Sequence, residues 1–160
     1  MQENNIKKKT ENNMSVLKIK KLSDKAVVPN RATQGSAGMD LYACIDNDIV
    51  INPQERILIP TGIAIELESS DYVAYIYARS GLSVKHGITL SNCVGVIDSD
   101  YRGEIKVGLI NLSDTPYTIT SNERIAQMVI SKVEQPQIIC VDELAQTQRG
   151  EGGFGSTGKN

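Results

Sequence analysis

Cysteine and histidine are scarce in this 160-residue chain, and their scarcity excludes several kinds of site. The 3 cysteines, Cys44, Cys93 and Cys140, lie far apart and form no C-x-x-C pair. An odd number of unpatterned cysteines argues against a disulfide-stapled secreted domain and against a zinc site. His86 is the only histidine, so a Ser–His–Asp triad would have to include it, and no G-x-S-x-G turn is present. We therefore expect reduced thiols and a histidine on the surface or in a loop.

Long apolar runs and an excess of basic residues are also absent. No stretch approaches the roughly 20 apolar residues that a membrane-spanning helix needs. The N-terminal residues are polar, include Lys7, Lys8 and Lys9, and lead into no apolar signal-peptide core. The formal net charge is −2, which differs from the strongly basic balance typical of nucleic-acid-binding proteins. These absences predict a cytoplasmic protein that binds neither membranes nor nucleic acid.

Short apolar or alternating runs, separated by turn residues, make up most of the chain. The first begins at Val16, and the others lie at 37–43, 56–66, 72–77, 88–90, 94–97, 105–112, 117–120, 124–133 and 138–141. A helical period is not sustained anywhere, and only residues 80–84 are compatible with a helical turn. Many short strands without intervening helices predict an all-β domain, built as a barrel or a sandwich.

The composition divides the chain into three segments. Residues 1–14 are polar, and we expect a disordered N-terminal extension. Residues 15–145 contain the predicted strands and are long enough to bury one core. Residues 146–160 contain 5 of the 13 glycines and the only phenylalanine, Phe154. Such a glycine-rich arm loses too much backbone entropy to hold one shape alone, so its single ring indicates a lid that orders when the ring stacks on a ligand.

The stretch from 92 to 104 is the most informative part of the sequence. An apolar run at 94–97 ends in Asp-Ser-Asp-Tyr at 98–101, and an alternating run opens after the glycine at 103. This pattern predicts a β-hairpin whose tip or edge gathers two carboxylates and an aromatic ring. On pattern alone, a polar turn between two strands explains the residues equally well.

Three further positions have groups suited to phosphate or to a metal. Arg79-Ser80-Gly81 ends a strand with a guanidinium, a hydroxyl and free backbone amides, which favour anions. Asp40 lies in the middle of a strand, and its carboxylate is suited either to cap a turn or to bind the water shell of a metal ion. Gln127 interrupts an apolar alternation, so it faces either solvent or a site. Taken singly, each of these residues is better explained by a structural role.

The C-terminal residues 153–159 match the phosphate-binding pattern G-x-x-x-x-G-K only superficially. Asn160 stands where that pattern has Ser or Thr, so we reject a P-loop. Consecutive Gly, Ser and Thr residues can nevertheless surround a phosphate with backbone N–H groups and hydroxyls.

Together, five blocks resemble the five motifs of the trimeric deoxyuridine triphosphatases, the dUTPase family, in order and spacing. The blocks are 37–43, 78–83, 92–104, 123–127 and 149–158. The third and fifth blocks are specific enough that chance agreement of both is negligible, and the resemblance covers about residues 18–158. Ala78 is a departure, because the family commonly has proline there. The change loosens the turn but removes no functional atom.

The resemblance implies a homotrimer of jelly-roll-like β-barrels whose active sites are shared between subunits and completed by a mobile C-terminal arm. It implies hydrolysis of dUTP with water to dUMP and pyrophosphate. This activity limits uracil incorporation into DNA and supplies dUMP for thymidylate synthesis. Mg²⁺ would be bound mainly by the triphosphate, with Asp40 in its outer shell through water.

The resemblance also implies a role for each site residue. Asp98 would orient the attacking water and take its proton, since a carboxylate is ionised at neutral pH. Tyr101 would pack against the deoxyribose and leave no room for a 2′-hydroxyl. Asn92 and backbone groups around Gly95 would read the uracil, and Phe154 would stack on it. The phosphate chain would be held by Arg79, Ser80, Gly81, Gln127, Arg149, Ser156, Thr157 and Gly158.

Two other functions stay open at this point. A dCTP deaminase occurs on the same fold, but it needs a carboxylate aimed at the cytosine amino group, and the base-facing residues offer Asn92 and no obvious acid. A non-catalytic nucleotide-sensing trimer would be expected to lack Asp98 or the arm, and both are present. The role of Arg124 also stays open, between a substrate contact and the orientation of neighbouring carboxylates, and Asp100 is expected to be a turn residue.

Overall fold

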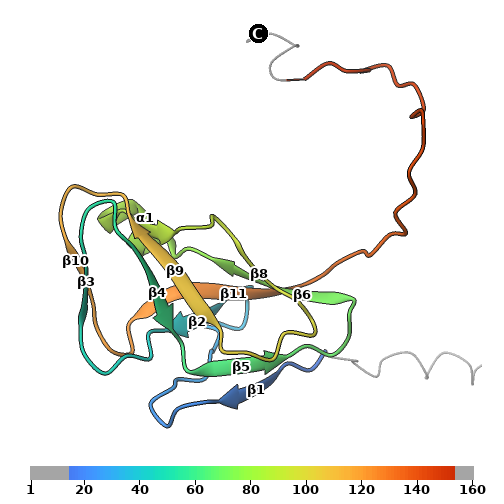
Figure 1. Cartoon of the computed structure of the whole chain (residues 1–160). Helices are drawn as coiled ribbons and strands as arrows, with labels where there is room; N and C mark the ends of the chain where they lie inside the picture. Colours follow the sequence, from blue (N-terminus) through green and yellow to red (C-terminus); the bar gives the residue numbers. More distant parts are fainter. Residues whose placement is uncertain (1–14, 154–160) are drawn as a thin grey trace, which may run out of the picture.

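The computed structural model describes residues 15–153, and β-strands dominate this part of the chain (Figure 1). The elements in chain order are β1 Lys18–Lys21, β2 Met39–Tyr42, β3 Ile49–Ile51, β4 Arg56–Pro60, β5 Ile63–Glu66, β6 Tyr72–Tyr77, α1 Ser80–His86, β7 Ile88–Leu90, β8 Gly95–Ile97, β9 Lys106–Asn111, β10 Tyr117–Ile119 and β11 Arg124–Lys132. The predicted all-β class is confirmed. None of the described residues form a helix long and apolar enough to cross a membrane.

The strands form four hydrogen-bonded sheets rather than one closed barrel. The largest has the order β2-β11-β6-β8, and a three-stranded sheet has the order β4-β9-β7. Two further pairs, β1 with β5 and β10 with β3, extend the structure at its ends (Figure 1). All pairings are antiparallel.

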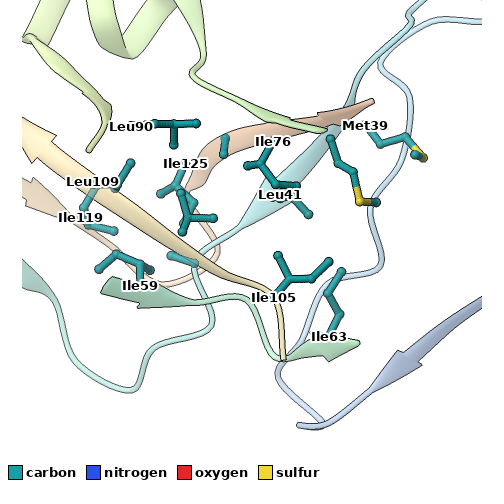
Figure 2. Packing of buried hydrophobic residues seen from close by; sticks show 14 of the residues in the cluster. Met39, Leu41, Ile59, Ile63, Ile76, Leu90, Ile105, Leu109, Ile119 and Ile125 are labelled. Atoms are coloured by element: carbon teal, nitrogen blue, oxygen red, sulfur yellow. The ribbon is translucent and has the colours of Figure 1, made fainter. Parts of the chain in front are cut away.

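One hydrophobic core joins the two larger sheets. In β2, Met39 and Leu41 are buried while the alternate residues are only half-buried, as the two-residue period of a strand requires. Leu41 packs in the same cluster as Leu109 of β9, and Figure 2 shows the side chains of both sheets gathered there. Each fully buried Leu or Ile contributes about 1.5–3 kcal/mol, so this cluster holds the two sheets together.

The register of the four-stranded sheet aligns polar residues on the face away from this core. Asp40 of β2 lies opposite Gln127 of β11, and Gln127 lies opposite Tyr77 of β6. Gln127 is flanked by two buried residues, Ala126 and Met128, so its own side chain leaves the sheet on the other side. The interruption of the apolar alternation at Gln127 thus marks the outer face of the sheet.

Three local predictions need correction or extension. Residues 80–84 belong to a helix that continues to His86, rather than to a single turn. The predicted strand at 138–141 does not form. Ile138 is 94% exposed there, and no strand in the described part of the chain satisfies its backbone. The short strand β3 was not predicted, because three residues are too few to give a period.

The predicted hairpin at 92–104 is also wrong in its pairing. Its first arm, β8, pairs with β6, while its second arm continues into β9, which pairs with β4 and β7. The two arms therefore enter different sheets, because each finds a partner elsewhere in the chain. The apolar pattern predicted the strands correctly but could not identify their partners.

The chain leaves the body of the molecule after β11. Residues 133–153 contain no helix or strand, and Figure 1 shows them running away from the sheets as an extended arc. The predicted N-terminal extension and residues 154–160 of the predicted arm lie outside the described residues. The proposed segment boundaries therefore stay a prediction.

Candidate functional site

Asp40 forms the centre of a polar cluster at one end of the four-stranded sheet. Its Oδ1 lies 3.1 Å from Nε of Arg79, and its Oδ2 lies 3.1 Å from Nη1 of Arg124. Arg79 also donates from Nη1 to the backbone carbonyl of Arg124 at 2.8 Å. Two guanidinium groups thus share one carboxylate, which leaves the cluster with a net positive charge. Such a cluster favours anions.

Gln127 lies beside this cluster in a fixed orientation. Its Nε2 donates to the carbonyl of Ala78 at 2.9 Å. Its Oε1 lies over Gly38, where a Cβ atom would come within 2.6 Å of it. Any residue larger than glycine at position 38 would therefore displace the Gln127 side chain. The backbone before Asp40 and the backbone before Arg79 together determine where this amide points.

The start of α1 adds unpaired backbone donors to the same end of the sheet. Arg79 precedes the helix in an extended conformation, with φ −90° and ψ 128°, and gives it no side-chain cap. Ser80 and Gly81 follow as the first helical residues, and both are exposed. The N–H groups of a first helical turn have no partner within the helix. Ser80 and Gly81 therefore present a hydroxyl and backbone N–H groups next to Arg79.

A polar contact between Tyr117 and Glu123 stabilises the turn that precedes Arg124. Tyr117 of β10 donates from Oη to Oε1 of Glu123 at 2.6 Å, and Glu123 accepts the backbone N–H of Thr120 at 3.0 Å. Burial, together with the hydrogen bond to Glu123, raises the pKa of Tyr117 to about 12. Glu123 directly precedes Arg124, so this contact fixes the turn from which Arg124 emerges. His86 is exposed, as expected, and its ring centroid lies 5.0 Å from that of Tyr117.

The space between β8 and β9 forms a small cavity of about 110 Å³. Asn92 and Gly95 line it on one side, and Lys106 and Gly108 line it on the other. This cavity exists because the two arms of the stretch from 92 to 104 enter different sheets. It brings together Asn92 and Gly95, two of the residues for which the resemblance implies base recognition.

The loop after β8 presents Asp98 and Tyr101 to solvent. Asp98 is exposed, and its carboxylate makes no hydrogen bond with another side chain within residues 15–153. Tyr101 is 44% exposed and donates from Oη to the carbonyl of Glu104 at 3.0 Å. Arg102 closes the loop by donating from Nη1 to the carbonyl of Ser99 at 2.7 Å. Asp100 is exposed and lines the same groove as Asp98, of about 590 Å³.

The loop between β8 and β9 (residues 98–105, the Asp98 loop) and the cluster of Asp40, Arg79 and Arg124 (the arginine cluster) lie at opposite ends of β6. The last residue of β8, Ile97, pairs with Ala74, so Asp98 lies beyond that row. Arg79 follows β6 at its other end. The five steps from Ala74 to Arg79 span roughly 17 Å at about 3.3 Å per residue. Within one chain, the predicted water-activating carboxylate therefore does not meet the predicted phosphate-binding residues.

The predicted residues of the C-terminal arm are only partly described. Arg149 is exposed and donates from Nε to the carbonyl of Gly152 at 2.7 Å. It joins neither the arginine cluster nor the Asp98 loop. Phe154, Ser156, Thr157 and Gly158 lie outside the described residues, so their predicted roles stay predictions.

A family model described as dUTPase matches residues 24–158 of this chain. The chain belongs to the dUTPase family. The match covers most of the chain and includes both the arginine cluster and the Asp98 loop. The resemblance expected from the five sequence blocks is thereby confirmed.

Relatives of known name agree with this membership of the dUTPase family. The chain is 55% identical over 132 residues to the deoxyuridine 5'-triphosphate nucleotidohydrolase of Neisseria meningitidis serogroup A, covering 82% of this chain and 88% of that one. It is also 55% identical over 143 residues to the protein of the same name from Nautilia profundicola, covering 89% and 99%.

A solved structure of the family has the same fold. A variant of the Staphylococcus bacteriophage 80alpha dUTPase, determined with dUpNHpp, superposes with a TM-score of 0.81 at 29% identity. The superposition covers 89% of this chain and 98% of the phage chain. The arrangement of strands described above is therefore the dUTPase arrangement.

Sequence reasoning missed several residues that shape this dUTPase site. The role of Arg124 was left open between a substrate contact and the orientation of neighbouring carboxylates, and the structure places its guanidinium on Asp40. Gly38 and Gly103 were not site candidates, although each lies directly under a functional side chain. A glycine next to a functional block is a weak signal, because a glycine in a turn gives the same pattern.

Proposed function

We propose that this chain hydrolyses dUTP with water to dUMP and pyrophosphate. The observation that carries the proposal is the loop from 92 to 101, in which a small cavity, an exposed carboxylate and an exposed tyrosine follow one another. Relatives at 55% identity have the name deoxyuridine 5'-triphosphate nucleotidohydrolase, and the phage structure was determined with dUpNHpp, a dUTP analogue.

The cavity between β8 and β9 is the proposed uracil site. Asn92 offers an amide that both donates and accepts, and the backbone at Gly95 offers further polar groups. Cytosine reverses the donor and acceptor at its 4-position, which would leave buried polar groups unpaired. A site built in this way rejects the wrong partner by about 10⁴–10⁵.

Asp98 is the proposed general base. Its exposed carboxylate can accept a proton from a water molecule, which then attacks the α-phosphorus while the bond to pyrophosphate breaks. General base catalysis of this kind contributes about 10²–10⁴ to the rate. Tyr101 lies in the same loop and would pack against the deoxyribose.

The arginine cluster is the proposed triphosphate site. Arg79 and the amide of Gln127 would contact phosphate oxygens, together with the hydroxyl and N–H groups of Ser80 and Gly81. Arg124 would not touch the substrate. Its guanidinium would hold Asp40, and its backbone carbonyl would hold Arg79. In the arm, Arg149, Ser156, Thr157 and Gly158 would add phosphate contacts, and Phe154 would stack on the base.

Magnesium fits this site only as an ion that arrives with the triphosphate. Residues 15–153 contain no cluster of three or more metal-ligating side chains. Asp40 uses one lone pair on each oxygen for an arginine, and a carboxylate has about four acceptor sites in total. Asp40 would therefore accept hydrogen bonds from the waters of the ion. When bound, Mg²⁺ would neutralise part of the phosphate charge.

The separation along β6 supports a site shared between copies of the chain. The Asp98 loop of one copy would approach the arginine cluster of another, in a homotrimer with the arm contributed across the interface. The outer face of β6 and β8 suits such a contact, since Tyr77 is 37% exposed there and Val96 is 58% exposed. Apolar side chains on one sheet face favour burial against a partner.

A pyrophosphate-release assay with dUTP, dCTP, dTTP and UTP tests this function. We expect rapid release from dUTP and at least about 10²-fold slower release from the other three nucleotides. Deamination of dCTP without pyrophosphate release would instead identify the deaminase, and binding of dUTP without turnover would identify a nucleotide sensor. Either result would contradict the proposal.

A further inference from the structure

The ring of Tyr101 lies directly on the backbone of Gly103. A Cβ atom built on Gly103 would come within 2.4 Å of the Tyr101 Oη, 2.6 Å of Cζ and 3.0 Å of Cε2. Two ring carbons and the hydroxyl oxygen at such distances show that the tyrosine covers the position that any other residue's side chain would occupy. The lack of a side chain at position 103 therefore creates the place in which the tyrosine ring lies.

The loop around this ring is fixed by four hydrogen bonds. Tyr101 donates from its backbone N–H to the carbonyl of Asp98 at 3.2 Å and from Oη to the carbonyl of Glu104 at 3.0 Å. Arg102 donates to the carbonyl of Ser99 at 2.7 Å. Glu104 is held in turn, because its Oε1 accepts the backbone N–H of Gly62 at 2.9 Å. The ring thus rests on a loop that cannot easily follow it if it moves.

We infer that Gly103 determines sugar specificity by positioning Tyr101. The inference rests on the proposed function, in which Tyr101 packs against the deoxyribose and excludes a 2′-hydroxyl. Gly103 covers the hydroxyl end of the ring, and Tyr101 as a whole residue is still 44% exposed, so another part of it is free for the sugar. The distance between sugar and ring is then set by how closely the ring approaches the backbone.

Alanine at position 103 isolates this effect. Gly103 does not have a positive φ, so its backbone conformation accepts alanine and the new methyl group is the only change. That methyl cannot coexist with the present ring position, because contacts of 2.4–3.0 Å are far below van der Waals contact. The ring must move away from the backbone, toward the space in which the sugar would lie.

A double-mutant cycle with two substrates tests the inference. The variants are Gly103→Ala, Tyr101→Ala and the double variant, each assayed for kcat/KM with dUTP and with UTP. We expect Gly103→Ala to reduce the preference for dUTP over UTP by about 10-fold or more, mainly through a higher KM for dUTP. In the Tyr101→Ala background the same substitution should change nothing further, because its effect passes through the ring.

Gly35→Ala is the matched control, since Gly35 also lacks a positive φ and no atom lies within 4 Å of its Cβ position. This control should keep the wild-type preference. If Gly103→Ala keeps that preference, or loses it equally with and without Tyr101, the inference is wrong. A wild type that does not prefer dUTP would contradict the proposed function, and the inference with it.

A second variant serves if Gly103→Ala does not fold. Tyr101→Phe keeps the ring but removes its hydrogen bond to the Glu104 carbonyl. A lower preference for dUTP in this variant would support a fixed ring position, and an unchanged preference would overturn it.

Discussion

At the scale of single residues, the site depends on small residues beneath large ones. Gly38 leaves room for the amide of Gln127, and Gly103 leaves room for the ring of Tyr101. Asp40 has a comparable supporting role, because its two oxygens hold Arg79 and Arg124. The groups proposed to touch the nucleotide are thus positioned by residues that do not touch it.

Tyr117 gives a residue-level prediction about stability and pH. Its pKa is raised from 10.0 to about 12 by burial and by the hydrogen bond to Glu123. The folded state therefore favours the protonated phenol. This contribution to stability is complete below pH 10 and is lost as the pH rises from about 10 to about 12.

The free energy of unfolding, measured in urea between pH 9 and pH 12, tests this prediction. We expect a decrease across this range in the wild type and a shallower decrease in Tyr117→Phe, which has no phenol to ionise. The other five tyrosines are the same in both proteins, so the difference between the two curves isolates Tyr117. Parallel curves would show that the Tyr117–Glu123 contact contributes no pH dependence.

The sequence predicted site residues best where a functional group interrupts a structural pattern. Gln127 interrupts an apolar alternation, and the structure places it on the outer face beside Asp40. The contacts between Asp40 and Arg124 could not be predicted, because the two residues are 84 positions apart and meet only through strand pairing. Which residues meet across a sheet depends on its register, and alternation along one strand carries no information about that register.

At the scale of elements, strands were easier to predict than their partners. The alternating residues of β9 and β11 identify them as strands. Only the assembled fold shows that β8 pairs with β6 and leaves a cavity beside β9. The predicted hairpin failed for this reason, since proximity in sequence favours a hairpin and the hydrophobic core favours separate sheets.

The C-terminal segment shows the opposite situation, a strand-like sequence without a strand. Ile138 and Leu144 are 94% and 86% exposed, and Ile139 and Val141 are also largely exposed. An apolar extended segment that finds no partner among residues 15–153 is suited to contact another copy. The sequence of this segment is thus consistent with a structure that is complete only in the assembly.

Removal of the arm tests the role of this last element. Truncation after Gln148 removes no residue of the core cluster, because that cluster ends with Met128. We expect a folded protein with a Tm close to that of the full chain and with little dUTP hydrolysis. Phe154→Ala should be milder, because stacking of a base on an aromatic ring contributes about 1–3 kcal/mol. Normal kcat/KM in the truncated protein would show that the arm is not a lid.

Across the whole molecule, the net charge is negative, whereas the local charge of the arginine cluster is positive. The chain has a formal net charge of −2, yet the arginine cluster has two guanidiniums for one carboxylate. A polyanionic substrate requires local positive groups and backbone N–H groups, and the total charge of the chain matters less. The low net charge is therefore compatible with a nucleoside triphosphate substrate.

The residues of the proposed site are distributed over both ends of one strand. Asp98 and Arg79 lie at opposite ends of β6, roughly 17 Å or more apart along the strand. One water molecule cannot be activated by the first residue while the second holds the phosphate that it attacks, unless two chains contribute. The proposed function therefore requires an assembly.

Mixing two inactive variants tests whether the active site is shared between chains. Asp98→Asn lacks the proposed base, and Arg79→Ala lacks the proposed phosphate ligand, so each alone should hydrolyse dUTP at most at about 10⁻² of the wild-type rate. The two are unfolded together in equal amounts, refolded, and compared with each variant refolded alone. In randomly mixed trimers, a site has both native residues when the Arg79→Ala variant contributes its Asp98 and the Asp98→Asn variant contributes its Arg79. The probability that a given site is of this kind is about one quarter. Recovery of about a quarter of the wild-type activity is the predicted result, and a mixture no more active than its components would contradict a site shared between chains.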